Sequence, residues 1–180
     1  MRPDILVLGK ALSGGLFPIS AVLADDAIML LIKPGEHGST FAGSPLAAAV
    51  GAESLRVVVE EGLCANAVER GAQLRAGLER AVAAHPALLA RSRGVGLMSA
   101  LDVRPDAADA RGRTVSARDI CLALGDAPER FGARVGVLAK PTHGHMIRLT
   151  PPLTIKKREV KQALDVLELV LARIAAGSGT

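Results

Sequence analysis

The feature that most constrains this chain is a short apolar run, Ile5 to Gly9, that leads directly to Lys10. A short apolar run bounded by proline and glycine is typical of a strand buried in a parallel sheet. Such a strand delivers the next residue to the carboxyl edge of the sheet, where α/β proteins bind ligands. We therefore expect a partly desolvated Lys10 whose neutral amine can attack a carbonyl and form a Schiff base. The alternative is a solvated lysine that only closes a strand.

The composition excludes several classes of protein. Hydrophobic residues make up 49% of the 180 residues, and we expect neither a signal peptide nor a bilayer-spanning run. The net charge of +4 is spread along a chain with three Phe and no Tyr or Trp, which argues against nucleic-acid binding. Cys64 and Cys121 are isolated, without metal-type or disulfide spacing, which indicates a reducing compartment. We expect a cytoplasmic protein without metal, membrane or nucleic-acid sites.

A polar loop at residues 33–45 is a second candidate site. It contains Gly38, Ser39 and Thr40, and its apolar residues show no regular spacing. Hydroxyl and backbone donors beside a glycine can bind an anion such as phosphate. An ordinary Ser/Thr turn followed by Ser44 as the cap of the next helix is an equally good interpretation.

Hydrophobic periodicity predicts the remaining elements and one domain boundary near Gly62. We expect an amino-terminal region at residues 1–62, a second domain at 63–176 and a disordered tail at 177–180. Polar loops are expected at 104–113 and 125–134. The predicted strands are 19–24, 93–103, 135–139 and 145–149, and the predicted helices are 25–31, 45–61, 63–84, 116–124 and 156–175.

Arg148 is a third candidate, because it lies between Ile147 and Leu149 in a predicted strand. If those two side chains face the core, Arg148 points to the opposite face, and a covered guanidinium there must meet an anion. The planar guanidinium suits a carboxylate. A solvated strand arginine is the alternative.

Three segments carry a resemblance to a known family: LGKALSGG at 8–15, KPGEHGSTFAGSPLA at 33–47 and LAKPTHGHMIRLTPPL at 138–153. In this order they resemble the carboxyl-terminal part of class III pyridoxal-phosphate aminotransferases, over nearly the whole chain. Within the class, AKPTHG before IRLTPPL is most similar to the ornithine aminotransferases. The resemblance implies an α/β fold: the end of the large mixed-sheet domain of a fold-type I transferase (1–62, with the linking helix) and the small carboxyl-terminal domain (63–176).

The resemblance also implies roles for four residues. Lys10 matches the lysine that holds pyridoxal 5'-phosphate and moves the proton between substrate and cofactor. Ser39 and Thr40 match the phosphate-binding position, which this family supplies from the neighbouring subunit of a homodimer. Arg148 matches the arginine that takes the substrate carboxylate. The implied reaction moves the δ-amino group of ornithine to 2-oxoglutarate.

The chain departs from the family because its lysine is the tenth residue, whereas the family places it past the middle. Four family features are missing: the glycine-rich phosphate turn, the stacking aromatic, the Asp at the pyridine nitrogen and the substrate gate. We therefore expect a fragment or shortened product with exposed apolar strands. The alternatives are an inactive remnant that associates with an intact subunit, and a related ω-aminotransferase such as the acetylornithine enzyme.

Overall fold

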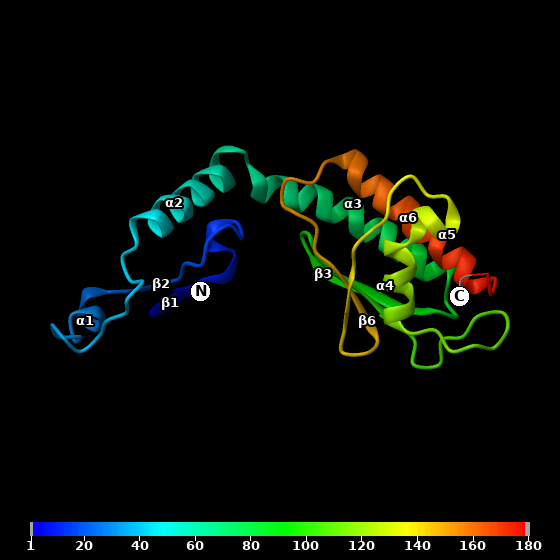
Figure 1. The fold of residues 1–180 in the computed structure, drawn as a ribbon, viewed down its shortest axis with the longest axis horizontal. Helices are drawn as coiled ribbons and strands as arrows, with labels where there is room; N and C mark the ends of the chain where they lie inside the picture. The colour runs from blue at the N-terminus through cyan, green and yellow to red at the C-terminus, as the bar shows by residue number, and fades with distance from the viewer. Residues whose placement is uncertain (1, 179–180) are drawn as a thin grey trace. The chain divides into compact units, whose positions relative to one another are not determined.

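A computed structural model describes residues 2–178 of the chain (Figure 1). The chain divides into two compact units, Met1–Leu63 and Cys64–Thr180, and each is described by itself. Both units combine helices with antiparallel strands. Among the described residues, none of the helices combines the length and apolar character that a bilayer crossing requires.

The first unit is built on a two-stranded ribbon. Strand β1 (Ile5–Leu8) pairs antiparallel with β2 (Ala21–Ala24), and the 3₁₀ helix η1 (Lys10–Ser13) follows β1. The short helix α1 (Asp26–Met29) ends two residues before the predicted end at Leu31. Helix α2 (Pro45–Glu60) begins where predicted, because the Ser44 hydroxyl caps it by accepting from the Ala47 N–H at 3.4 Å.

The prediction of a buried strand in a parallel sheet is wrong for β1. The strand is antiparallel to β2, and Ile5 and Val7 are 52% and 70% exposed. A strand is buried on both faces only when other elements cover both of them. Within this unit α2 packs against η1, and the side chains of the β1–β2 ribbon stay exposed to solvent. The expected exposure of apolar strand surface is confirmed.

The second unit is a four-stranded antiparallel sheet with helices, in strand order β3-β4-β6-β5. Its long helix α3 matches the predicted limits, and Gly62 before it has a φ of 63°. The capping box of Ser116 and Asp119 starts α4 at the amino-terminal limit of the predicted helix 116–124. The elements are α3 (Leu63–Ala84), β3 (Leu89–Val95), β4 (Met98–Val103), α4 (Ala117–Gly125), α5 (Ala127–Phe131), β5 (Lys140–Thr142), β6 (Met146–Leu149) and α6 (Lys157–Ala175).

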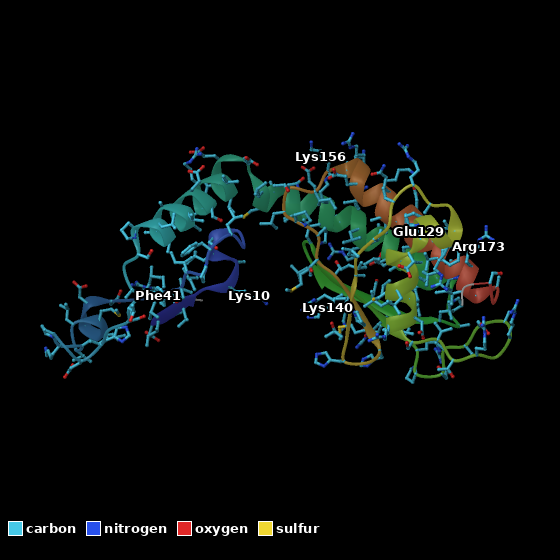
Figure 2. All side chains as sticks on the ribbon, in the orientation of Figure 1. Lys10, Phe41, Glu129, Lys140, Lys156 and Arg173 are labelled. Atoms are coloured by element: carbon cyan, nitrogen blue, oxygen red, sulfur yellow. The ribbon has the colours of Figure 1, made fainter. Side chains whose placement is uncertain are left out.

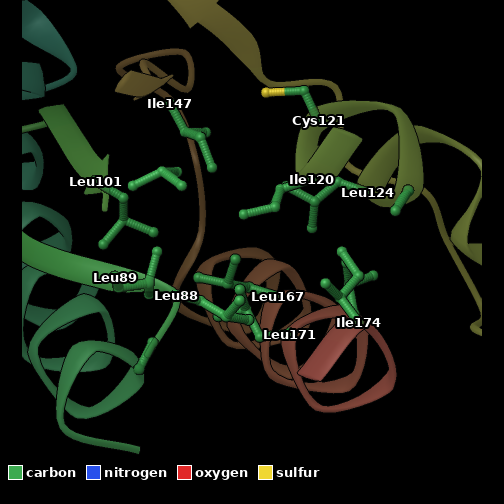
Figure 3. Packing of buried hydrophobic residues seen from close by; sticks show 14 of the residues in the cluster. Leu88, Leu89, Leu101, Ile120, Cys121, Leu124, Ile147, Leu167, Leu171 and Ile174 are labelled. Carbon is green, nitrogen blue, oxygen red and sulfur yellow. The ribbon is translucent and has the colours of Figure 1, made fainter. Parts of the chain in front are cut away.

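The hydrophobic core of the second unit lies between the sheet and its helices (Figure 3). Leu101 of β4 and Ile147 of β6 pair in register and are fully buried, as are Ile120 of α4 and Leu171 of α6. Two glycines of α3 permit close packing. A Cβ on Gly77 would collide with the Leu164 side chain of α6, and one on Gly71 with the backbone of Gly96.

Three predictions for the second unit are wrong. The predicted single strand at 93–103 is the hairpin β3–β4, because Gly96 turns the chain with a φ of 54°. The predicted loop at 125–134 contains α5, with Pro128 in its first turn and Gly132 as a left-handed cap. Residues 135–139 form no strand, since the Val137 N–H donates to the Leu124 carbonyl at the end of α4.

The carboxyl-terminal tail was predicted to be disordered from residue 177. The Gly177 N–H donates to the Ile174 carbonyl and the Ser178 N–H to the Arg173 carbonyl, each at 2.9 Å. Arg113 Nη2 donates to the Gly177 carbonyl at 3.1 Å, which ties this segment to the loop before α4. Residues 179–180 lie outside the described residues.

Candidate functional site

Lys10 is the first residue of η1 and is separated from β1 by Gly9 alone (Figure 2). Its φ is 53°, in the left-handed region that a non-glycine residue rarely adopts and that costs about 1–2 kcal/mol. Two hydrogen bonds hold the turn that follows it. The fully buried Ser13 hydroxyl donates to the Phe17 carbonyl and accepts from the Phe17 N–H at 3.1 Å. Unfavourable backbone conformations of this kind concentrate at functional sites.

The environment of the Lys10 amine differs from the sequence prediction. The side chain is exposed, so the expected partial desolvation is absent among the described residues. Within residues 2–178 its amine makes neither a hydrogen bond nor an ion pair. The amine is therefore accessible to a carbonyl compound, but this chain's described residues do not shield it from water.

Ser39 and Thr40 lie in the exposed loop before α2. The Phe41 N–H donates to the Ser39 hydroxyl at 3.4 Å, as in a Ser/Thr turn, and Ser44 caps α2, so both features of the alternative interpretation are present. Among the described residues the Thr40 hydroxyl has no hydrogen-bond partner. Its exposure leaves it able to donate to an anion.

A hollow of about 870 Å³ in the first unit is lined by Ser39, Phe41 and residues 18–22. Neither Lys10 nor Thr40 is among its lining residues. The structure therefore does not gather Lys10, Ser39 and Thr40 around one cavity of a single chain.

Arg148 lies in β6 of the second unit, with Ile147 fully buried on the opposite face of the sheet. The guanidinium Nε of Arg148 is buried and has no hydrogen-bond partner. Arg148 lines a cavity of about 570 Å³ formed by residues of the second unit alone. A buried donor of this kind is costly unless a ligand or water satisfies it, so the cavity is a candidate anion site.

Sequence reasoning missed Lys140, because it places residues 140–144 in a turn between the predicted strands 135–139 and 145–149. Lys140 is the first residue of β5 and lies directly opposite Arg148 in the β5–β6 register. A signal was available in the sequence, because Lys140 and Arg148 are each four residues from Gly144, which has a φ of 76° in the turn. A hairpin centred on that glycine pairs the two cations.

Solved structures of aminotransferases share the fold of this chain. The fold matches the carboxyl-terminal portion of solved ornithine aminotransferases. The match to the enzyme of Plasmodium yoelii has a TM-score of 0.81 and 40% identity, over 97% of this chain and 42% of that chain. The acetylornithine aminotransferase of Elizabethkingia anophelis matches with a TM-score of 0.79 and 43% identity, over 93% of this chain and 38% of that one.

The sequence profile described as aminotransferase class-III matches residues 1–171, and the chain belongs to this family. It is 48% identical over 172 residues to the mitochondrial ornithine aminotransferase of Oryza sativa subsp. japonica, covering 93% of this chain and 34% of the relative. It is 45% identical over 167 residues to the mitochondrial enzyme of Rattus norvegicus, again covering 34% of the relative. The chain thus spans about a third of the length of these relatives.

The family depends on pyridoxal phosphate, and the residues present fit two of the contacts that this cofactor needs. Its aldehyde requires an accessible amine, which Lys10 supplies. Its phosphate requires exposed donors, and the Thr40 hydroxyl and the neighbouring backbone are exposed. No group of three or more metal-ligating side chains is found in residues 2–178.

Proposed function

We propose that this chain is the lysine-bearing part of an ornithine aminotransferase, which transfers the δ-amino group of ornithine to 2-oxoglutarate. The products are glutamate semialdehyde and glutamate. One observation carries the proposal: Lys10 is held in a left-handed conformation at the end of β1, inside the segment that matches the class III aminotransferases. The identities of 45–48% to plant and rat ornithine aminotransferases support the choice of amino donor.

The proposed roles divide among the two units. Pyridoxal phosphate, when bound, supplies an electron sink that stabilises negative charge on the substrate carbon. Lys10 provides the amine that bonds to the cofactor aldehyde and, once released, its Nζ takes and returns the substrate proton. Thr40, with Ser39 beside it, binds the phosphate from the neighbouring subunit of a homodimer. Arg148 binds the substrate carboxylate.

The reaction requires more than this chain's described residues provide. The Lys10 amine is exposed to solvent, whereas proton transfer at a substrate carbon needs an enclosed and oriented amine. The rice enzyme extends well beyond the matched region, because the match covers 34% of its length. We propose that the region of the enzyme outside this match supplies the contacts to the cofactor ring. The proposed compartment is the cytoplasm, where both free cysteines stay reduced.

A second candidate is an acetylornithine aminotransferase, which the 43% identity to the Elizabethkingia anophelis enzyme favours. The two functions share every proposed role in this chain. They differ in whether the α-amino group of the donor carries an acetyl group. Amino transfer from ornithine and from acetylornithine, measured side by side on the assembled enzyme, separates them.

The test begins with the chain as it exists. The purified protein is mixed with pyridoxal phosphate, reduced with borohydride and digested, and the adduct is located by peptide mass. We expect one stoichiometric adduct at Lys10 that Lys10→Ala abolishes. Lys33→Ala is the matched control, because Lys33 is an exposed lysine of the same unit and should not alter the adduct. Labelling spread over many lysines, or none, would mean that this chain is an inactive remnant.

A further inference from the structure

The segment 9–20, which carries Lys10, is closed at both ends by the pairing of β1 with β2. Between these ends the backbone takes a positive φ three times, at Lys10 (53°), Gly14 (66°) and Gly15 (87°). Glycine adopts such values without a steric cost, whereas lysine does not. The path of the closed segment therefore places a steric cost on Lys10 alone, and interactions elsewhere in the segment must offset it.

Ser13 is the one polar residue that is buried among the described residues of the first unit. It is the last residue of η1 and the only buried residue of that helix. Helix α2 packs against η1, and its Ser54 hydroxyl would lie only 3.2 Å from a Cβ on Gly14. Because α2 approaches this turn so closely, the Ser13 hydroxyl faces into the unit and away from water.

The Ser13 hydroxyl acts as donor and acceptor at once. It donates to the Phe17 carbonyl and accepts from the Phe17 N–H at 3.1 Å, and among the described residues these are the only side-chain hydrogen bonds of the segment. At the other end of η1, the Leu12 N–H donates to the Gly9 carbonyl at 3.2 Å across Lys10. Buried hydrogen bonds are costly to break, because the partner that remains is left unpaired. The side chain of Ser13 therefore fixes the end of η1 that lies opposite Lys10.

We propose that Ser13 is a positioning residue for Lys10, whose buried hydroxyl holds η1 in the shape that keeps Lys10 left-handed. Rotation of φ about the N–Cα bond changes the direction of the lysine side chain relative to β1. Ser13 thus controls where the Lys10 amine points, and not whether it is accessible. That this direction serves amino transfer rests on the proposed function, whereas the control of the Lys10 backbone does not.

Nuclear magnetic resonance of the chain without pyridoxal phosphate tests the control of the backbone. The three-bond coupling between the amide and α protons of Lys10, with the distance between them, gives its φ, and hydrogen exchange reports on the Leu12 and Phe17 amides. We expect Ser13→Ala to lose the positive φ of Lys10 and to speed exchange at both amides about fivefold or more. Ser13→Thr, which keeps a hydroxyl, should retain the positive φ and the slow exchange.

The direction of the amine is tested by the reaction with pyridoxal phosphate and borohydride. The measured quantity is the ratio of the Lys10 adduct to the minor adduct at Lys33, an exposed lysine of the same unit that corrects for differences in cofactor concentration. Ser13→Ala should lower this ratio about fivefold or more. Ser13→Thr should retain it.

Ser44→Ala is the matched control for a loss of stability. It removes the hydroxyl that caps α2 in the same unit and leaves the turn after Lys10 untouched. Neither the φ of Lys10 nor the adduct ratio should change in this variant. If circular dichroism shows that Ser13→Ala does not fold, Ser13→Cys, close in size but with a weaker hydrogen-bonding group, replaces it with the same expected results.

Three results would each overturn the positioning role. They are a positive φ of Lys10 that persists without the Ser13 hydroxyl, a lost φ with an unchanged adduct ratio, and equal effects of Ser13→Ala and Ser44→Ala. Loss of the φ in Ser13→Ala with no Lys10 adduct in the unmodified chain would instead refute the proposed function and leave Ser13 as the residue that fixes the Lys10 backbone. A Lys10 adduct with an unchanged φ in Ser13→Ala would do the reverse.

Discussion

Asp102, buried on β4, accepts a hydrogen bond of 2.7 Å from the Arg91 Nε, directly opposite it on β3. Burial alone would raise the pKa of this carboxyl group. Hydrogen bonds and charge from Arg91 and Arg93 outweigh burial, and the pKa of Asp102 is lowered from its ordinary value of 3.8. The ionised carboxylate therefore stabilises the second unit.

The first prediction concerns the pH dependence of this stabilisation. Because the pKa is lowered in the folded state, the stabilisation is fully present above about pH 4 and is lost as the pH falls through the folded value. Asp102→Asn should lower the free energy of unfolding by about 1–3 kcal/mol at pH 7, and the difference should shrink as the pH falls below about 4. Urea unfolding at several pH values measures both effects.

A matched control for Asp102 is Glu79→Gln on α3. Glu79 is exposed and has no ion pair among the described residues. Its substitution should change the unfolding free energy by less than about 0.5 kcal/mol at either pH. A constant difference between Asp102→Asn and the unmodified chain from pH 7 to pH 3 would contradict the prediction.

Close packing of α3 on the β3–β4 turn leads to the second prediction. A Cβ on Gly71 would collide with the backbone of Gly96, which cannot move without displacing the turn. Gly71→Ala should therefore destabilise the chain by about 1–3 kcal/mol, although alanine favours a helix by about 1 kcal/mol. For Gly125→Ala the nearest atom would be Leu138 Cδ2 at 3.8 Å, so urea unfolding should find this variant equal to or more stable than the unmodified chain.

The third prediction is a difference in reactivity between the two cysteines. Cys121 is buried in the core, and burial raises the pKa of its thiol to about 11. Its thiolate fraction at pH 8 is therefore on the order of one in a thousand. Cys64 is exposed at the start of α3. A disulfide reagent at pH 8 should modify one thiol of the folded chain and both thiols in denaturant.

Substitution of Cys64 identifies the reactive thiol. The variant Cys64→Ser should show no rapid modification while folded and a single thiol when denatured. Rapid modification of two thiols in the folded chain would mean that the helix α4 which carries Cys121 is not packed as described.

Elements with regular hydrophobic periodicity were predictable from the sequence, and short or polar elements were not. The limits of α3 agree with the prediction because its apolar positions repeat over many turns and Gly62 ends the helix before it. Helix α5 was missed because five residues are too few to show a period. The β3–β4 hairpin was missed because the partly alternating pattern of residues 93–103 continues through its turn at Gly96.

The candidate site was predictable by residue type but not by geometry. The sequence identifies Lys10 and Arg148 as candidates, yet no residue pattern around Lys10 indicates its positive φ. The register that places Lys140 opposite Arg148 depends on which residues form the turn. A prediction that assigned Lys140 to the turn could not place the two cations together.

The fourth prediction concerns the open ribbon of the first unit. Val7 and Val22 pair on one face of it and Leu6 and Leu23 on the other, and all four are between 43% and 70% exposed. Apolar strands exposed on both faces associate with other chains. The purified chain should self-associate in analytical ultracentrifugation. The double variant Val7→Lys, Leu23→Lys should raise the dissociation constant of this self-association about tenfold or more. Val68→Lys, an exposed valine on α3, should have no such effect, and a monomeric unmodified chain at all concentrations would contradict the prediction.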